Sequence, residues 1–294
     1  MEEFRGILRV EGKTAYLEGE GGERYLEGEA IWSGYSRHWI NQPVCACRLA
    51  QRDYDTGRPL ILLWPVPERG DGPFVELYYN ERLVKYPAST FGHLAVNVNG
   101  EIFNFSHLIN ENEVMSPEEY FYRPALGEFA PDPVTGRFST ERPGRPYFDK
   151  FGSNFMRTIH VLRLEELDAG RLGRYYHREL EIIRNTPPDP ARPEKYRDFS
   201  FLRRSCTTII RDGLRECGFS GVSGLLPRDL FVCASAFLLR EQRRGVLRVR
   251  LYRRPQLMVE EAPRSAITPL LNPLNWLRLS RLPGDYLQLA LPFM

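Results

Sequence analysis

The sequence lacks the motifs of several common protein classes. Neither Gly-x-x-x-x-Gly-Lys-Ser/Thr nor Gly-x-Gly-x-x-Gly occurs, which excludes the two glycine-rich loops that most often bind nucleotide phosphates. His-Glu-x-x-His is absent, so the usual helical zinc-protease site is excluded as well. No apolar run reaches the roughly 18 residues that a membrane-spanning helix needs. The N-terminus, Met-Glu-Glu-Phe-Arg, has no signal-peptide pattern, so we expect synthesis in the cytoplasm.

Cysteines are few and the charge is balanced. Five cysteines, an odd number spread over 294 residues, do not make the disulfide framework of a small secreted protein. Cys45 and Cys47 alternate along an expected strand and face the same way; with no second Cys or His pair nearby, packing is favoured over metal binding. We therefore expect no metal and no cofactor. Lys and Arg total 40 against 38 Asp and Glu, so the net charge does not favour a nucleic-acid partner.

A short β-hairpin is predicted around a central Asn-Gly pair. Asn99-Gly100 is the strongest two-residue turn signal, because both central positions of a type I′ turn need positive φ. Counting outward from this turn places Ala95 opposite Asn104 and His93 opposite Ser106. Cross-strand partners and residues two apart share one face of a sheet, so His93, Asn104 and Ser106 should project together. Asn104 is then the candidate that orients the imidazole, with Ser106 as the alternative.

A helix is predicted from Cys206 to Glu216. Ser205 before it is a favoured N-cap residue, so Cys206 lies in the first turn. There the free backbone N–H groups and the helix dipole should lower the pKa of the thiol. The helical period puts Cys206 on the apolar stripe, and Gly213 on the same stripe indicates that another backbone passes close by. A thiol needs a base to become the nucleophilic thiolate, and His93 is the candidate base.

Together these segments resemble the circularly permuted branch of the NlpC/P60 papain-like superfamily, in which the histidine hairpin precedes the cysteine helix. The matches on the hairpin are Gly92-His93 and Asn104. The matches around the cysteine are Tyr196, Ser205, Cys206, Thr207 and Thr208. Such chains often carry a Pro-x-Asp-Leu strand lead-in soon after the helix, and the corresponding residues are Pro227-Arg228-Asp229-Leu230.

The resemblance implies a cysteine-dependent acyl hydrolase or acyltransferase. It makes Cys206 the nucleophile, His93 the general base and Asn104 the residue that orients the base. Auxiliary positions are Ser106, Ser205, Thr207 and Tyr196. It implies a bacterial envelope substrate, either a peptidoglycan peptide amide or a phospholipid ester. By analogy with secreted toxins, it also implies delivery by a specialised secretion system to a target-cell envelope, with the secretion apparatus or an immunity protein as partners.

The expected fold class is α+β in two domains. Residues 1–72 have the pattern of short strands separated by glycine-rich turns, which predicts a small β-barrel or β-roll of the OB or SH3 type. Those strands are expected at Phe4 to Val10, Arg24 to Trp32, Pro43 to Arg52 and Leu60 to Pro65. Residues 73–294 would form the permuted papain-like NlpC/P60 domain, an antiparallel sheet packed on the Cys-bearing helix. Within it we expect an insertion at 117–150 and a C-terminal extension at 245–294.

Three alternatives stay open from the sequence. On the same fold, the protein could be a non-catalytic binding or adaptor protein that uses the β-domain and the aromatic residues of 117–150. His107 competes with His93 as the base, although counting places it on the opposite face of its strand. The arginine-rich segment from Val246 to Tyr252 and the leucine-rich tail after Ala266 could touch an anionic lipid surface, or the tail could pack on its own domain.

Overall fold

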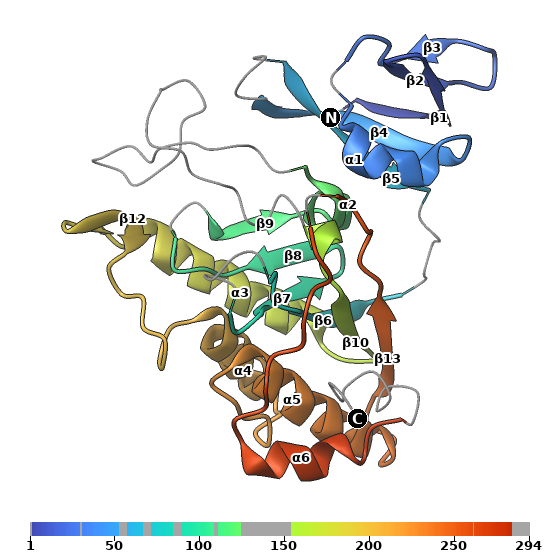
Figure 1. Ribbon diagram of the computed structural model, residues 1–294. Helices are drawn as coiled ribbons and strands as arrows, with labels where there is room; N and C mark the ends of the chain where they lie inside the picture. Colours follow the sequence, from blue (N-terminus) through green and yellow to red (C-terminus); the bar gives the residue numbers. More distant parts are fainter. Residues whose placement is uncertain are drawn as a thin grey trace.

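The computed structural model describes residues 2–29, 31–52, 58–66, 72–84, 90–108, 111–124, 154–260 and 262–283. Two larger antiparallel sheets, a two-stranded hairpin and six α-helices make up these residues, which confirms the predicted α+β class. The N-terminal sheet lies at one end of the molecule, and the longer helices gather around the other sheet (Figure 1).

The N-terminal sheet has five antiparallel strands in the order β3-β2-β1-β4-β5. Their bounds are β1 Glu3–Glu11, β2 Thr14–Glu18, β3 Arg24–Tyr25, β4 Pro43–Arg52 and β5 Pro59–Pro65. The strand expected from Arg24 to Trp32 does begin at Arg24, but it ends at Tyr25, because Leu26 and Gly28 have positive φ and turn the chain out of the sheet. A short helix follows instead, α1 Ser33–Ser36. Closure of this sheet into a barrel stays a prediction.

Alternation along β4 explains the paired cysteines. Val44 and Ala46 face the main core of the N-terminal sheet, whereas Cys45 and Cys47 face the opposite side and pack against Trp64. Both thiols are free and buried. Burial raises the pKa of both, that of Cys47 to about 11. The two cysteines therefore share a face and pack, as predicted from their spacing.

The N-terminal sheet shares its core with the rest of the chain. The ring of Tyr35 stacks on that of Phe155 at 5.1 Å between centroids, and Trp39 meets Tyr122 edge-on at 5.5 Å. Val259, near the C-terminal end, is buried in the same cluster. These contacts join residues from both expected domains, so the N-terminal sheet is fixed to the larger part by aromatic packing.

The central sheet has six antiparallel strands in the order β13-β10-β6-β7-β8-β9. Their bounds are β6 Phe74–Asn80, β7 His93–Val98, β8 Glu101–Asn104, β9 Glu113–Met115, β10 Ile159–Glu165 and β13 Arg248–Arg254. The edge strand β13 comes from the expected C-terminal extension, 245–294, so part of that extension completes the sheet. The two-stranded hairpin, β11 Pro188–Asp189 and β12 Arg192–Tyr196, lies apart from it.

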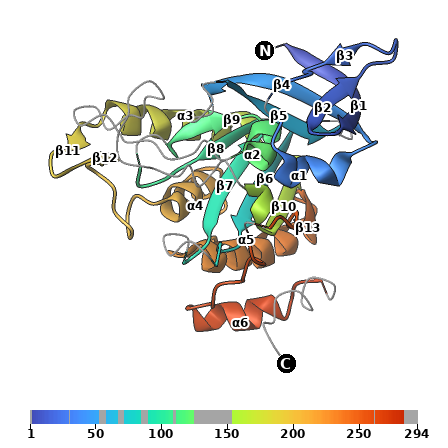
Figure 2. The ribbon, with the colours of Figure 1, turned by 45° about the horizontal axis from the view of Figure 1, so that its top comes forward.

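Helices cover both faces of the central sheet (Figure 2). Three of them pack on one face, where Leu94, Val96 and Phe103 are buried: α3 Ala169–Asn185, α4 Cys206–Glu216 and α5 Pro227–Gln242. On the other face, Tyr120 and Phe121 of helix α2 Pro117–Tyr122 pack with the strand residues of that side. The predicted insertion thus begins with a packed helix, and its residues 125–150 lie outside the described residues.

The segment Pro227-Arg228-Asp229-Leu230 begins helix α5, so the expected strand lead-in is wrong. Proline is favoured at the first helical position, and an acidic residue in the first turn complements the helix dipole. The carboxylate of Asp229 also accepts hydrogen bonds from the backbone N–H groups of Leu271 and Asn272, both at 3.1 Å. It thereby fixes the start of the last helix, α6 Pro273–Leu279.

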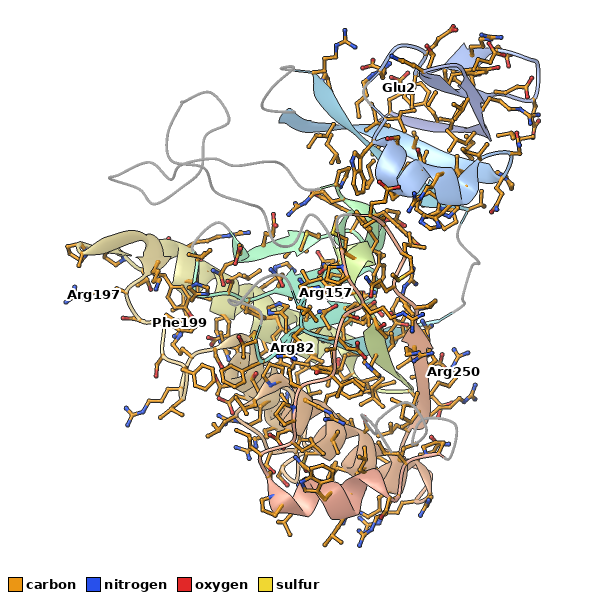
Figure 3. All side chains as sticks on the ribbon, in the orientation of Figure 1. Glu2, Arg82, Arg157, Arg197, Phe199 and Arg250 are labelled. Atoms are coloured by element: carbon orange, nitrogen blue, oxygen red, sulfur yellow. The ribbon has the colours of Figure 1, made fainter. Side chains whose placement is uncertain are left out.

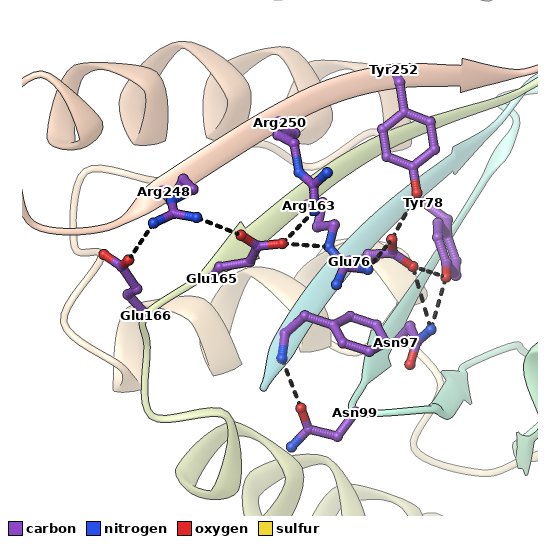
Figure 4. A network of polar contacts seen from close by, with 11 residues as sticks. Glu76, Tyr78, Asn97, Asn99, Arg163, Glu165, Glu166, Arg248, Arg250 and Tyr252 are labelled. Carbon is purple, nitrogen blue, oxygen red and sulfur yellow. Dashed lines mark hydrogen bonds and ion pairs between the residues drawn. The ribbon is translucent and has the colours of Figure 1, made fainter. Parts of the chain in front are cut away.

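A buried carboxylate connects four strands of the central sheet. Arg250, labelled in Figure 3, lies on the edge strand, and the close view in Figure 4 follows the contacts inward from it. Glu76 of β6 accepts hydrogen bonds from Tyr78, from Arg163 of β10 and from Tyr252 of β13, at 2.5, 3.1 and 2.7 Å. Asn97 of β7 donates to the Tyr78 hydroxyl at 2.9 Å. These bonds fix β13, β10, β6 and β7 relative to one another.

Gly213 of α4 provides a test of the helix packing. A Cβ atom at this position would lie 2.7 Å from the ring of Tyr176, a fully buried residue of α3 that donates to the Ile210 carbonyl at 3.1 Å. The close neighbour is therefore an aromatic ring and not the backbone expected from the sequence. We expect Gly213→Ala to lower the free energy of unfolding by about 1–3 kcal/mol in a denaturant titration.

Gly170→Ala is the matched control, because the same added Cβ in the first turn of α3 would have no atom nearer than 3.5 Å. Its stability should stay the same or rise slightly. Equal stability of the two variants would contradict the packing described for α3 and α4.

Candidate active site

The predicted hairpin register is confirmed. Asn99 and Gly100 have φ of 53° and 97°, the positive values that a type I′ turn requires. Ala95 pairs with Asn104, as counted from the turn. His93 at the start of β7 then reaches diagonally across to Asn104 at the end of β8, with 2.6 Å between the imidazole Nε2 and the amide Oδ1.

The Asn104 amide fixes the tautomer of His93. Its Nδ2 donates to the backbone carbonyl of Glu111 at 2.6 Å, and Asn104 is fully buried. The amide oxygen must therefore face the imidazole, and an oxygen can only accept a hydrogen bond. Consequently Nε2 of His93 carries the proton when the ring is neutral, and Nδ1 is the basic nitrogen.

The loop after β8 positions Glu111, whose backbone carbonyl accepts the hydrogen bond from Asn104. Ser106, the alternative orienting residue, donates its hydroxyl to the carboxylate of Glu111 and not to His93. The Asn112 side chain accepts from the Ser106 backbone N–H at 2.9 Å and donates to the carbonyls of Ser106 and Leu108 at 3.0 and 2.6 Å. Ser106 therefore supports the site by shaping this loop. The sequence analysis missed Glu111 and Asn112, whose only signal is an Asn-rich turn.

Cys206 is the first residue of α4, as predicted. Ser205 and Thr208 form a reciprocal capping box, in which each side chain bonds the other's backbone N–H group. This cap fixes the helix start beside strand β7, on which α4 packs. The Cys206 Sγ atom lies 3.8 Å from the hydroxyl of Thr207, which is itself buried.

The predicted lowering of the Cys206 pKa is wrong. Burial raises the pKa of the thiol above its ordinary value, because a thiolate loses hydration there. The backbone N–H of Leu94 and the hydroxyl and N–H of Thr207 lower it, but together they do less than burial does. A raised pKa favours the neutral thiol, from which a base must remove the proton during attack.

His93 and Cys206 line one pocket of about 180 Å³. Ser106, Ser205 and Thr207 also line it, and the remaining wall consists largely of rings. The aromatic and proline residues of that wall are Phe91, Phe105, His107, Phe199, Phe201 and Pro227. The structure thus brings the nucleophile candidate and its base candidate together beside an aromatic surface.

His107 also reaches this pocket, so its predicted exclusion from the site is wrong. Strand β8 ends at Asn104, and the alternation used to place His107 on the other face stops there. The His107 Nδ1 atom lies 3.5 Å from the Ser106 hydroxyl, and its ring contacts that of Phe199 at 5.6 Å. His107 therefore forms part of the wall, while the Asn104 contact belongs to His93.

Tyr196, the last auxiliary candidate, lies behind the pocket wall. It is almost fully buried, and its hydroxyl donates to the Arg204 carbonyl at 2.8 Å. Its ring meets Phe199 edge-on at 5.9 Å. Tyr196 therefore holds the segment that carries Phe199 and leads to Ser205, and it has no direct place in the pocket lining.

A buried arginine lies behind the hairpin and was not predicted. Arg157 is 2% exposed, and burial lowers its pKa to about 10 against the opposing effects of Tyr120 and Glu111. Tyr120 accepts a 2.6 Å hydrogen bond from Asn80, the strand partner of His93. Figure 3 places Arg157 in the middle of the molecule, among the strands of the central sheet. A buried cation thus interacts electrostatically with Tyr120, the residue bonded to the strand partner of His93, and with Glu111.

No family model, curated protein or solved structure matches this chain. Within the ranges that the structure describes, no three His, Cys, Asp or Glu side chains gather as a metal site would require. In the same ranges, no helix has the combined length and apolarity to cross a bilayer.

The raised pKa of Cys206 predicts a specific pH dependence of alkylation. Because a raised pKa places half-ionisation of the thiol above its ordinary midpoint of about 8.5, the rate with iodoacetamide should keep rising beyond that pH. Cys206 should still react before Cys47, which is buried and has a pKa of about 11. Mass spectrometry of peptides from a pH series measures both rates. A Cys206 rate that levels off below about pH 7 would contradict this assignment and indicate a preformed thiolate.

Proposed function

We propose that this protein is a cysteine-dependent acyl hydrolase or acyltransferase, with Cys206 as nucleophile, His93 as general base and Asn104 as the residue that orients the base. The observation that carries the proposal is the 2.6 Å contact between His93 Nε2 and Asn104 Oδ1 in a pocket that Cys206 also lines. That contact leaves Nδ1 of His93 basic, which is the property a neutral thiol requires of its partner.

The proposed reaction begins when His93 Nδ1 takes the thiol proton as Sγ attacks the acyl carbon. The carbon–sulfur bond forms while the carbonyl electron pair moves to oxygen, and backbone N–H groups at the start of α4 stabilise that oxyanion. The imidazolium then protonates the departing amine or alkoxide, which leaves a thioester on Cys206. Water or another acceptor, deprotonated by His93, then attacks the thioester carbon. The carbon–sulfur bond breaks, the acylated product leaves, and the imidazolium returns its proton to the Cys206 thiolate.

The substrate class follows from the resemblance to permuted NlpC/P60 enzymes, and it remains part of the proposal. We favour a bacterial envelope component, either a peptidoglycan peptide amide or a phospholipid ester. The ring-lined wall beside Cys206 suits an apolar acyl group. On the same analogy, the chain is a secreted antibacterial effector whose N-terminal sheet, which we propose closes as a small barrel, serves for loading.

A second function has one specific observation in its favour. The raised pKa of Cys206 is ordinary for a thiol that only packs, so the pocket could bind a ligand without chemistry. The N-terminal sheet and the aromatic wall would then form the binding surfaces of an adaptor protein. Thioester formation on Cys206 distinguishes the two functions, because a protein that only binds its ligand does not become acylated on this thiol.

Point variants test the proposed roles. Purified protein is incubated with muropeptides or with phospholipid vesicles, and the products are quantified by mass spectrometry. Cys206→Ala and His93→Ala should each lower turnover by about a thousandfold or more, because each removes a group that takes part in bond formation. Asn104→Ala should lower it by about a hundredfold, because the imidazole loses its tautomer and orientation.

Cys217→Ala is the matched control, since Cys217 caps the far end of α4, outside the pocket. Its turnover should equal that of the unsubstituted protein. Full activity of Cys206→Ala on the substrate that the native protein cleaves would refute the proposed mechanism.

A further inference from the structure

Four arginines converge on a second pocket, between α5 and α6. This pocket encloses about 250 Å³ and is lined by Gly221, by α5 and its C-cap from Cys233 to Arg243, and by Arg278 and Arg281. The arginines are Arg240, Arg243, Arg278 and Arg281. Pro227, the first residue of α5, lines the pocket that contains Cys206, whereas α5 lines the arginine pocket from Cys233 onward, so the two pockets share no lining residue.

The described residues that line the arginine pocket carry an excess of positive charge. None of these described lining residues has a carboxylate. Glu241 is the nearest acid in sequence, and it divides its carboxylate between Arg240 at 3.4 Å and Arg244 at 3.1 Å. Arg278 donates to the neutral Asn275 side chain at 2.7 Å. Several guanidinium groups around one small cavity match an oxyanion with several acceptor oxygens, such as a phosphate group.

An exposed apolar surface lies on the same helix that supplies Arg278. Trp276 is 50% exposed, Leu274 57% and Leu277 63%, and Leu271 just before the helix is 63% exposed. Figures 1 and 2 both show α6 as an outermost element, beyond α5. Large apolar side chains grouped on one exposed helix are costly in water unless a partner or a membrane covers them.

The orientation of α6 is fixed from its inner side. Asn275 is fully buried and donates to both the carboxylate and the carbonyl of Asp229, at 2.7 and 3.0 Å. Leu279 is buried as well and joins the main core. These contacts hold the helix with Leu274, Trp276 and Leu277 outward, so the exposure of these three side chains follows from how α6 is fixed.

We propose that α6 and the arginine pocket dock this protein on the surface of a membrane that contains anionic phospholipid. The pocket binds a headgroup phosphate, and Leu271, Leu274, Trp276 and Leu277 enter the boundary between headgroups and acyl chains. A short helix with apolar residues on one side and arginines beside them has the composition of an interfacial anchor, and tryptophan prefers that boundary. The charge of the pocket selects an anionic surface over a neutral one. This docking does not depend on the chemistry proposed for Cys206.

Vesicle binding tests the proposal directly. The full chain carrying Cys206→Ala, which prevents turnover, is mixed with vesicles of phosphatidylcholine alone or with added phosphatidylglycerol, and bound protein is measured by flotation. We expect binding only to the anionic vesicles, weakening as salt is raised. Arg243→Gln combined with Arg281→Gln should weaken it by about tenfold or more. Arg174→Gln with Arg184→Gln, on exposed positions of α3, is the charge-matched control and should bind as before.

The apolar contribution has its own variants. Leu274→Ser with Leu277→Ser should also weaken binding by about tenfold or more, whereas Val10→Ser with Ile182→Ser, at exposed positions elsewhere, should not. Phospholipids with brominated acyl chains should quench Trp276 fluorescence on binding, and Trp276→Phe should remove that change. Circular dichroism confirms that each variant is folded.

Three results would overturn the docking proposal. One is equal binding to neutral and anionic vesicles, and another is binding that survives both double variants. The third is a lack of vesicle binding. In that case, binding of soluble glycerol phosphate would assign the arginine pocket to a free phosphate compound, and a dimer detected by gel filtration would assign the exposed leucines to an interface between two copies of the chain.

Discussion

The candidate site depends on the two hydrogen bonds of the Asn104 amide. The amide oxygen accepts from His93, and the amide nitrogen donates to the Glu111 carbonyl. The second bond determines which end of the amide faces the imidazole. An amide with one fixed partner has no freedom to rotate, so the ring beside it has one neutral tautomer. The basic nitrogen of His93 is thus decided by a backbone carbonyl on a different segment.

That arrangement in turn requires the strand register of the central sheet. A shift by one residue would move either His93 or Asn104 to the opposite face and separate them. The positive φ values at Asn99 and Gly100 fix the register at the turn, and the Glu76 contacts fix β7 through its neighbouring strands. The turn and the Glu76 contacts therefore both help to keep His93 and Asn104 in contact.

Local signals in the sequence predicted the parts of the site that depend on neighbours along the chain. The turn pair Asn99-Gly100 gave the hairpin, and Ser205 marked the start of α4. The predictions that were wrong concern features that depend on tertiary contacts or on backbone conformations without a clear sequence signal. Burial of the Cys206 thiol, which the local sequence does not reveal, reversed the expected shift of its pKa. The end of β8 at Asn104 brought His107 to the pocket, and the fold of the loop brought Glu111 to Asn104.

The central claim is that Cys206 forms a covalent acyl intermediate with the help of His93. The most direct measurement is intact-protein and peptide mass spectrometry after brief reaction with an activated ester such as p-nitrophenyl acetate. Our account predicts one acyl group, located on Cys206, with its formation strongly slowed in His93→Ala and absent in Cys206→Ala. Acylation spread over the five cysteines, or unchanged in His93→Ala, would contradict it.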